Sequence, residues 1–180
     1  MIYTYDECVE KYGTKYLLEK AVSSGAIYRQ EKGVYSDEEY VPEEVIVAVK
    51  YPKAVFTLNS AFYQYGLTDV VPDKNYIATD RNAAKIPDKR VSQVFERSDL
   101  LDLGVENIDF HGYKLRIYSK ERLLIELLRH KNRMPFDYYK EIILNYRDMI
   151  NELNIPLIQE YILEMPKSGI IIEAMRLEVL

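Results

Sequence analysis

Hydrophobic and polar positions near the start of the chain recur with a helical period and predict two short helices. The run TYDE at residues 4–7 fits a capping box, in which a threonine hydroxyl and a glutamate three residues later satisfy free backbone amides. We expect this first helix to end at Gly13 and Thr14 to cap a second helix that runs through Ser24. The spacing of its apolar residues predicts a buried stripe made of Leu17, Leu18, Ala21 and Val22.

A short ribbon follows, in the segment SSGAIYRQEKGVYSD at residues 23–37. Alternating apolar and polar positions predict strands at 26–29 and 33–36, joined by a turn that contains Gly33. Two helices joined by a tight turn and followed by a hairpin are typical of a winged helix-turn-helix. We therefore expect a small winged-helix-like module at residues 1–52.

The remaining pattern predicts a mixed α/β body over residues 53–180 with a helical C-terminus. The expected fold class is therefore α+β, with the N-terminal module packed on or linked to this body. A helix that begins at Pro42 must end near Tyr51-Pro52, and Asn59 or Ser60 is expected to cap a helix through Tyr65. Strands are expected at 54–58, 76–79, 91–96, 106–110 and 113–118, the last two forming a hairpin. Helices are expected at 120–131, 137–153, 156–164 and 168–179.

Composition bears on the cellular compartment of the protein and on its association with membranes. The chain is 48% apolar and 29% charged, and no apolar run approaches the roughly 18 residues that span a bilayer. Its start lacks the basic flank and apolar segment of a secretion signal, and its one cysteine, Cys8, excludes an internal disulfide. We expect a cytoplasmic protein with no membrane partner.

Groups that carry catalysis are scarce. The two histidines, His111 and His130, lie far apart in sequence, and the chain lacks the phosphate-binding, dinucleotide-binding, zinc-protease and serine-hydrolase motifs. Nothing in the spacing of carboxylates or histidines selects a metal site. We therefore expect no catalytic residues, no cofactor, no metal and no enzymatic activity.

The charge of the N-terminal module bears on the hypothesis that it binds DNA. Residues 1–40 hold five basic and eight acidic side chains, which gives a net charge of −3. Proteins on nucleic acid gain most of their affinity from phosphate neutralisation, so two readings stay open: weak DNA binding, or a fold kept without strong DNA affinity. If DNA binds, the candidate contacts on the second helix and the hairpin are Lys15, Tyr16, Lys20, Arg29 and Lys32.

A second concentration of positive charge lies at residues 119–133, which hold five basic and two acidic side chains for a net charge of +3. Arg122, Glu126, Arg129 and Arg133 share one helical face, because they recur at i, i+4, i+7 and i+11. Pairing between arginine and glutamate within the helix is one explanation, and an acidic or phosphate-bearing partner is the other. In the second case the partner-binding residues would be Arg122, Arg129, Lys131 and Arg133.

Three segments taken in order resemble one known family. They are GAIYRQEKGVYSD, AVFTLNSAFYQYGLTD and YKLRIYSKERLLIELLRHKN, followed by FDYYKEIILNYRD at residues 136–148. Their order and spacing are similar to those of the AbiEi-like antitoxins of bacterial type IV toxin–antitoxin and abortive-infection systems. The matching features are Gly33-Val34-Tyr35 at the end of the wing, a helix that closes in Gly66-Leu67, and the helix start SKER at 119–122.

The resemblance spans residues 4–148 and implies a winged-helix module followed by an antitoxin domain. It implies an antitoxin that counters a cognate nucleotidyltransferase-like toxin, in many cases without a stable complex, in a system of phage defence. It also implies a transcriptional regulator that represses its own operon through promoter DNA. The alternative, from the residues alone, is a protein-interaction module without DNA binding that uses the basic helix face from Arg122 to Arg133.

Overall fold

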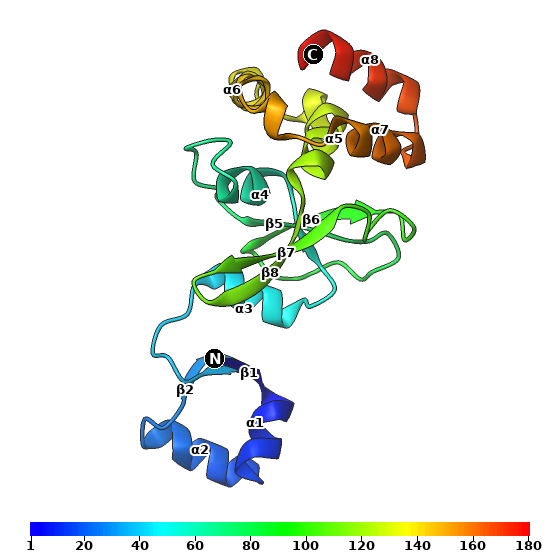
Figure 1. Ribbon diagram of the computed structural model, residues 1–180. Coiled ribbons are helices and arrows are strands. Elements are labelled where there is room, and N and C mark those ends of the chain that lie inside the picture. The colour runs from blue at the N-terminus through cyan, green and yellow to red at the C-terminus, as the bar shows by residue number, and fades with distance from the viewer. The chain divides into compact units, whose positions relative to one another are not determined.

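The structure is a computed structural model that describes all residues 1–180, and the chain divides into two compact units (Figure 1). The first contains Met1–Lys53 together with Asp109–Leu115, and the second contains Ala54–Ile108 and Arg116–Leu180. A three-stranded sheet and a five-stranded sheet accompany eight α-helices, which confirms the predicted α+β class. The segment Asp109–Leu115, at the tip of a hairpin, thus belongs to the first unit. The predicted domain boundary between residues 52 and 53 had placed this segment in the second domain.

The first unit consists of three helices and a small antiparallel sheet, with α1 and α3 packed on the sheet and α2 packed on α1. Its strands lie in the order β1-β3-β2, so the N-terminal strand pairs with the second strand of the hairpin. The sequence did not predict β1, because three residues are too few to show an alternating pattern. In chain order the elements are β1 (Ile2–Thr4), α1 (Tyr5–Tyr12), α2 (Lys15–Ser23), β2 (Tyr28–Glu31), β3 (Val34–Ser36) and α3 (Glu43–Lys50).

The first two helices of this unit, α1 and α2, begin at the threonines that the sequence indicated. The backbone amide of Thr4 donates to a carboxylate oxygen of Glu7 at 2.7 Å, and the hydroxyl of Thr4 accepts from the amide of Glu7 at 3.4 Å. Thr14 accepts from the amide of Leu17 at 3.3 Å. Each cap satisfies donors at a helix start that would otherwise be unpaired.

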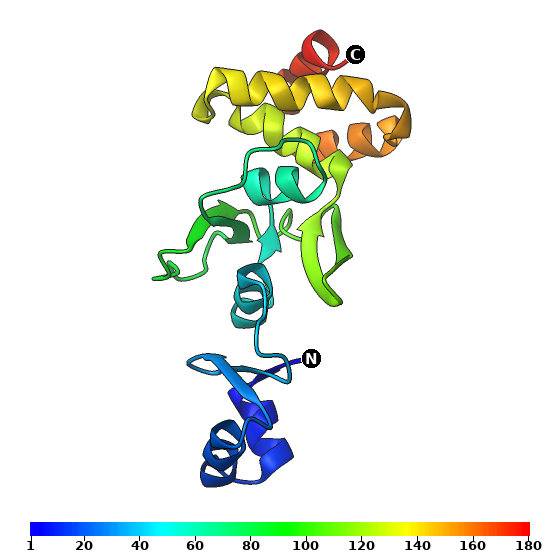
Figure 2. The same cartoon turned by 90° about the vertical axis from the view of Figure 1, so that its left-hand side faces the viewer.

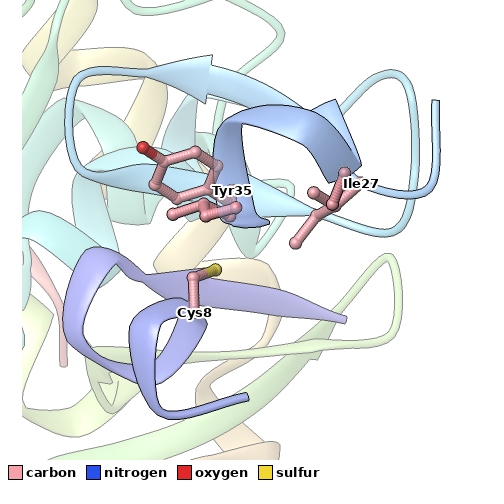
Figure 3. Close-up of a cluster of buried hydrophobic side chains, with 5 residues drawn as sticks. Cys8, Ile27 and Tyr35 are labelled. Carbon is pink, nitrogen blue, oxygen red and sulfur yellow. The ribbon is translucent and has the colours of Figure 1, made fainter. Parts of the chain in front are cut away.

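The core of the first unit is small. Figure 3 shows how Cys8 from α1, Ile27 ahead of β2 and Tyr35 from β3 converge in it. Leu18 and Ala21 of α2 complete the buried cluster. Leu17, predicted to be buried, is instead 45% exposed, because only one side of α2 faces this cluster.

The second unit is built on a five-stranded sheet in the order β6-β5-β4-β8-β7. The neighbours β5 and β6 run parallel, with Asn75 opposite Val91 and Asp80 opposite Glu96, although they follow one another in sequence. The connection at residues 81–90 has no helix, and Gln93 of β6 anchors it by accepting from the amide of Ile86 and donating to the carbonyl of Ala84. The strands are β4 (Val55–Phe56), β5 (Asn75–Asp80), β6 (Val91–Glu96), β7 (Val105–Phe110) and β8 (Tyr113–Tyr118).

Helix α5 leads out of β8 and is the centre of the helical part of this unit. It packs against α4, α7 and α8, and both views show α5 to α8 gathered at one end of the unit (Figures 1 and 2). Leu123, Leu124 and Leu127 are fully buried, which makes α5 the main carrier of the core. The helices are α4 (Leu58–Gln64), α5 (Lys120–His130), α6 (Phe136–Asp148), α7 (Ile155–Glu164) and α8 (Ser168–Glu178), with 3-10 turns at Lys131–Arg133 and Ile150–Glu152.

Two predicted boundaries in this unit were wrong. Helix α4 begins after Thr57 rather than at Asn59 or Ser60. The hydroxyl of Ser60 is used instead across the fold, where it accepts from the amide of Tyr76 at 2.8 Å and donates to the carbonyl of Lys74. Helix α6 ends at Asp148, not at Leu153, because a 3-10 turn follows it and carries the apolar pattern onward.

Candidate nucleic-acid interface

A hollow of about 740 Å³ lies within the first unit, beside α2 and the β2–β3 hairpin. Its cationic lining residues are Lys15 from α2, Arg29 from β2 and Lys32 from the turn. Arg29 and Lys32 are exposed, and the side chain of Lys15 is 72% exposed. Three of the five residues that the sequence selected as DNA contacts therefore meet around one concave surface.

The other two candidates lie outside this lining, on the solvent side of α2. Tyr16 is 71% exposed and Lys20 is exposed, while Leu18 and Ala21 of the same helix face the core. The helix therefore presents a polar side with two lysines and one tyrosine to solvent. The tyrosine offers a hydroxyl and a ring, and the lysines offer point charges suited to phosphate oxygens.

The hairpin places its two cations through an irregular register. Arg29 lies opposite Tyr35 and Glu31 opposite Val34, so the pairing shifts between Arg29 and Glu31. Such a bulge bends the strand and redirects side chains. The carbonyl of Gly33, at the turn, accepts from the amide of Tyr5 at 3.0 Å, which fixes the hairpin against the start of α1.

Ion pairs engage two of the acidic side chains near this surface. The carboxylate of Glu31, between the two hairpin cations in sequence, lies 2.8 Å from the ammonium of Lys50 on α3. Glu19 is 3.7 Å from Lys15, one helical turn away. The carboxylate that lies between the two hairpin cations in sequence is thus paired with a residue outside the DNA candidates, a pairing that no local charge count can reveal.

Sequence reasoning missed the aromatic part of this lining. Tyr5 and Tyr35 also border the hollow, together with Ser23 at the end of α2. Tyr5 is 38% exposed, whereas Tyr35 is 7% exposed and belongs to the core cluster. The capping box predicted that Tyr5 begins a helix, but no local signal shows that Tyr5 lies near the turn of the hairpin, since that contact is long-range.

The basic face predicted on α5 is largely not a surface. Arg122 is fully buried, which corrects its assignment as a partner-binding residue. Its guanidinium donates to Glu126 at 3.0 Å, to Glu96 at 3.0 Å and to the carbonyl of Leu100 at 3.3 Å. A buried guanidinium needs such partners, and the pairing within the helix that was one of the two explanations is observed here.

The remaining residues of that face differ in their availability. Arg129 is 21% exposed, and its guanidinium lies 2.6 Å from both Glu96 and Glu126. Lys131 is 2.7 Å from Glu178. Arg133 is exposed and forms neither an ion pair nor a hydrogen bond, so it is the one fully available cation of the predicted set.

The carboxylate of Glu126 is the shared partner of three basic side chains of α5. Burial alone would raise the pKa of its carboxyl group, but the hydrogen bond from His130 and the charges of Arg122 and Arg129 lower that pKa to about 2. The imidazole Nε2 of His130 lies 3.4 Å from Glu126 Oε2. One carboxylate thus faces three basic side chains on a single helix.

Other reactive groups do not converge. The structure contains no group of three or more histidine, cysteine or acidic side chains arranged to hold a metal ion. The thiol of Cys8 is buried, and burial raises its pKa, which disfavours the nucleophilic thiolate. His111 lies in the β7–β8 turn, beside the ring of Phe110 at 4.6 Å.

No helix combines the length and the apolar character needed to cross a membrane. No protein-family model matches the sequence, and no curated protein matches it either.

Proposed function

We propose that this chain is an AbiEi-like antitoxin of a type IV toxin–antitoxin system, a cytoplasmic regulator rather than an enzyme. Its first unit would be a winged helix-turn-helix that binds the promoter of its own operon. The observation that carries the DNA-binding part is that Lys15 of α2 and two cations of the β2–β3 hairpin line one hollow. The antitoxin part rests on the ordered motifs of the sequence, from the Gly-Val-Tyr of the hairpin to the helix start at Ser119.

Topology supports the winged-helix assignment. The element order β1-α1-α2-β2-β3 and the sheet order β1-β3-β2 combine a helix pair with a hairpin in one small sheet. In this mode α2 enters the major groove while the hairpin lies along the phosphate backbone. Lys20 and Tyr16 on α2 would extend the contacts made by the residues of the hollow.

The chemistry of these contacts predicts weak and salt-sensitive binding. The outward side of α2 carries lysine, tyrosine, glutamate and serine, but none of the arginine, asparagine or glutamine side chains that read bases through two hydrogen bonds. Lysines contact phosphates without reading sequence. Most of the affinity would therefore come from phosphate neutralisation.

Titration of the promoter duplex at several salt concentrations tests the DNA-binding part. Each neutralised phosphate contributes about −0.9 to the slope of log K against log salt, so four cations give a slope of at most about −3.6. Arg29→Gln and Lys32→Gln should each reduce the slope by about one. Lys11→Gln is the matched control, because Lys11 lies on α1 over the ring of Tyr3, 4.8 Å away, and does not line the hollow. An absence of binding at about 50 mM salt, or an equal loss in the control, would refute the interface.

Growth rescue tests the antitoxin part separately. We expect expression of this chain to restore growth to cells that express the nucleotidyltransferase encoded by the adjacent gene. The Arg29→Gln, Lys32→Gln double variant should still rescue when both proteins are expressed from unrelated promoters, because repression is then bypassed. Unrestored growth with the folded wild-type chain present would contradict the antitoxin assignment while leaving the DNA titration unaffected.

A further inference from the structure

A second hollow, of about 770 Å³, lies wholly within the second unit. One side is formed by strands β5 and β6, and the other by the end of α5, the following 3-10 turn and the start of α6. Its volume is in the range of pockets that take small molecules. We call it the β6 groove, and its functional lining is Tyr76, Glu96, Arg129, His130, Arg133 and Tyr138.

The helical side of the β6 groove is cationic. Arg129 is held in place by Glu96 and Glu126, at 2.6 Å from each, so its guanidinium is already ordered. The charges of those two carboxylates are balanced by Arg122 and Arg129. Arg133 adds a positive charge that no carboxylate in the structure offsets, and it is exposed at the same groove. An anionic group therefore finds one unpaired guanidinium beside a second one that is rigidly placed.

Aromatic side chains form another part of the lining. The hydroxyl oxygen of Tyr138 is buried and makes no hydrogen bond. Because that oxygen is closed to solvent, Tyr138 lines the groove through the rest of its side chain and would meet a ligand with its ring. Tyr76, whose hydroxyl donates to Asp73 at 3.2 Å, adds a second ring to the lining.

We propose that the β6 groove binds a nucleoside monophosphate, with the phosphate at Arg133 and the accessible edge of Arg129, and the base against Tyr138 and Tyr76. The guanidinium groups match the geometry of phosphate oxygens, and a planar base matches the tyrosine rings. Inorganic phosphate alone would leave the aromatic wall and most of the volume unused. This inference does not depend on the proposed function, since no residue of the first unit takes part in it.

Calorimetric titration of the full chain with AMP, GMP, CMP and UMP tests this site. We expect saturable binding of at least one of them, with weaker binding of the parent nucleoside and of inorganic phosphate. Arg133→Gln should weaken that binding roughly 10-fold, since it removes one charge-assisted contact. The matched control is Arg176→Gln on α8, which removes the same charge from an exposed position that does not line the groove, and it should change nothing.

Tyr138→Leu provides an independent check that does not alter charge. It removes the ring against which the base would stack, so nucleotide affinity should fall several-fold while the affinity for inorganic phosphate stays unchanged. Amide NMR shifts on titration should cluster at residues 92–96 and 129–138. The proposal would be overturned if no nucleotide bound saturably up to about 10 mM, or if inorganic phosphate bound equally well. Binding of oligonucleotides only, or an unchanged affinity of the Arg133 variant, would also overturn it.

Discussion

Glu126 shows how one buried carboxylate can set the orientation of several basic side chains. It is 2% exposed and is paired with Arg122, Arg129 and His130, all from the same helix. Removing one partner of a buried ion pair leaves the other charge without compensation. Most of the helical face that the sequence predicts to be a basic surface, from Arg122 to Arg129, is therefore an internal network.

The Glu126→Gln variant should lose roughly 3 kcal/mol of unfolding free energy at neutral pH. The folded-state pKa of Glu126, about 2, is below its ordinary value of 4.5, so its stabilising effect is complete above about pH 5. That effect is lost as the pH falls toward 2, because protonation then removes the carboxylate in the folded state too. The stability difference between wild type and variant should accordingly shrink over this interval.

Urea unfolding at a series of pH values measures this difference. Glu164→Gln is a suitable control, since Glu164 is exposed at the end of α7 and forms no ion pair. It should change stability by less than about 0.5 kcal/mol at any pH. A Glu126→Gln deficit that stays constant from pH 7 to about pH 2 would contradict the role of this carboxylate.

At the scale of elements, the contact between the start of β7 and α5 depends on one glycine. Gly104 has a φ of 73°, and a Cβ atom at this position would lie 2.7 Å from the Cβ of Arg122 and 3.0 Å from the ring of Tyr161. Its carbonyl accepts from the amide of Ser119, the N-cap of α5, at 2.7 Å. The close approach fixes the helix that carries the buried network.

Gly104→Ala should destabilise the second unit by roughly 2 kcal/mol or more, since it adds a steric overlap to an unfavourable φ. Gly66→Ala separates the two effects, because Gly66 has a φ of 67° but open space around its Cβ position. That variant should lose only about 1 kcal/mol. Equal losses in the two variants, measured by denaturant unfolding, would show that the approach to Arg122 has no steric cost.

Elements with a local chemical signal could be predicted from the sequence, and those that depend on long-range pairing could not. The threonine caps of α1 and α2 and the strand β6 were predicted where they occur, because capping residues and alternation act over a few positions. Strand β1 exists through its pairing with β3, thirty or more residues away. The parallel pairing of β5 with β6 likewise has no local signature.

The same distinction applies to the candidate sites. Helical spacing placed Lys15 and Lys20 on the outward side of α2, and the turn signal placed Lys32 at the hairpin tip. Spacing could not show that Glu96, from a strand 26 residues before Arg122, would pair with it and bury it. The β6 groove is made of four separate segments, so only the folded chain brings its cations and tyrosines together.

At the scale of the whole molecule, two cores of unequal size lie in one chain. The first unit buries the cluster of Cys8, Leu18, Ala21, Ile27 and Tyr35, together with Val45, Ile46 and Val47 of α3. In the second unit a single helix, α5, buries seven consecutive residues at 122–128. Because stability grows with the apolar surface that a core buries, the first unit should be the less stable of the two.

We therefore expect two thermal transitions in the intact chain, the first from the N-terminal unit. Leu18→Ala should lower only the first, because Leu18 is 1% exposed in the small core and its truncation costs about 2–5 kcal/mol. Leu124→Ala, at a fully buried position of α5, should lower only the second. Calorimetry gives the two midpoints, and amide hydrogen exchange assigns each one to its residues. A single transition that both variants shift equally would mean that the two units unfold as one. In that case DNA bound to the first unit would stabilise the whole chain, and not the first transition alone.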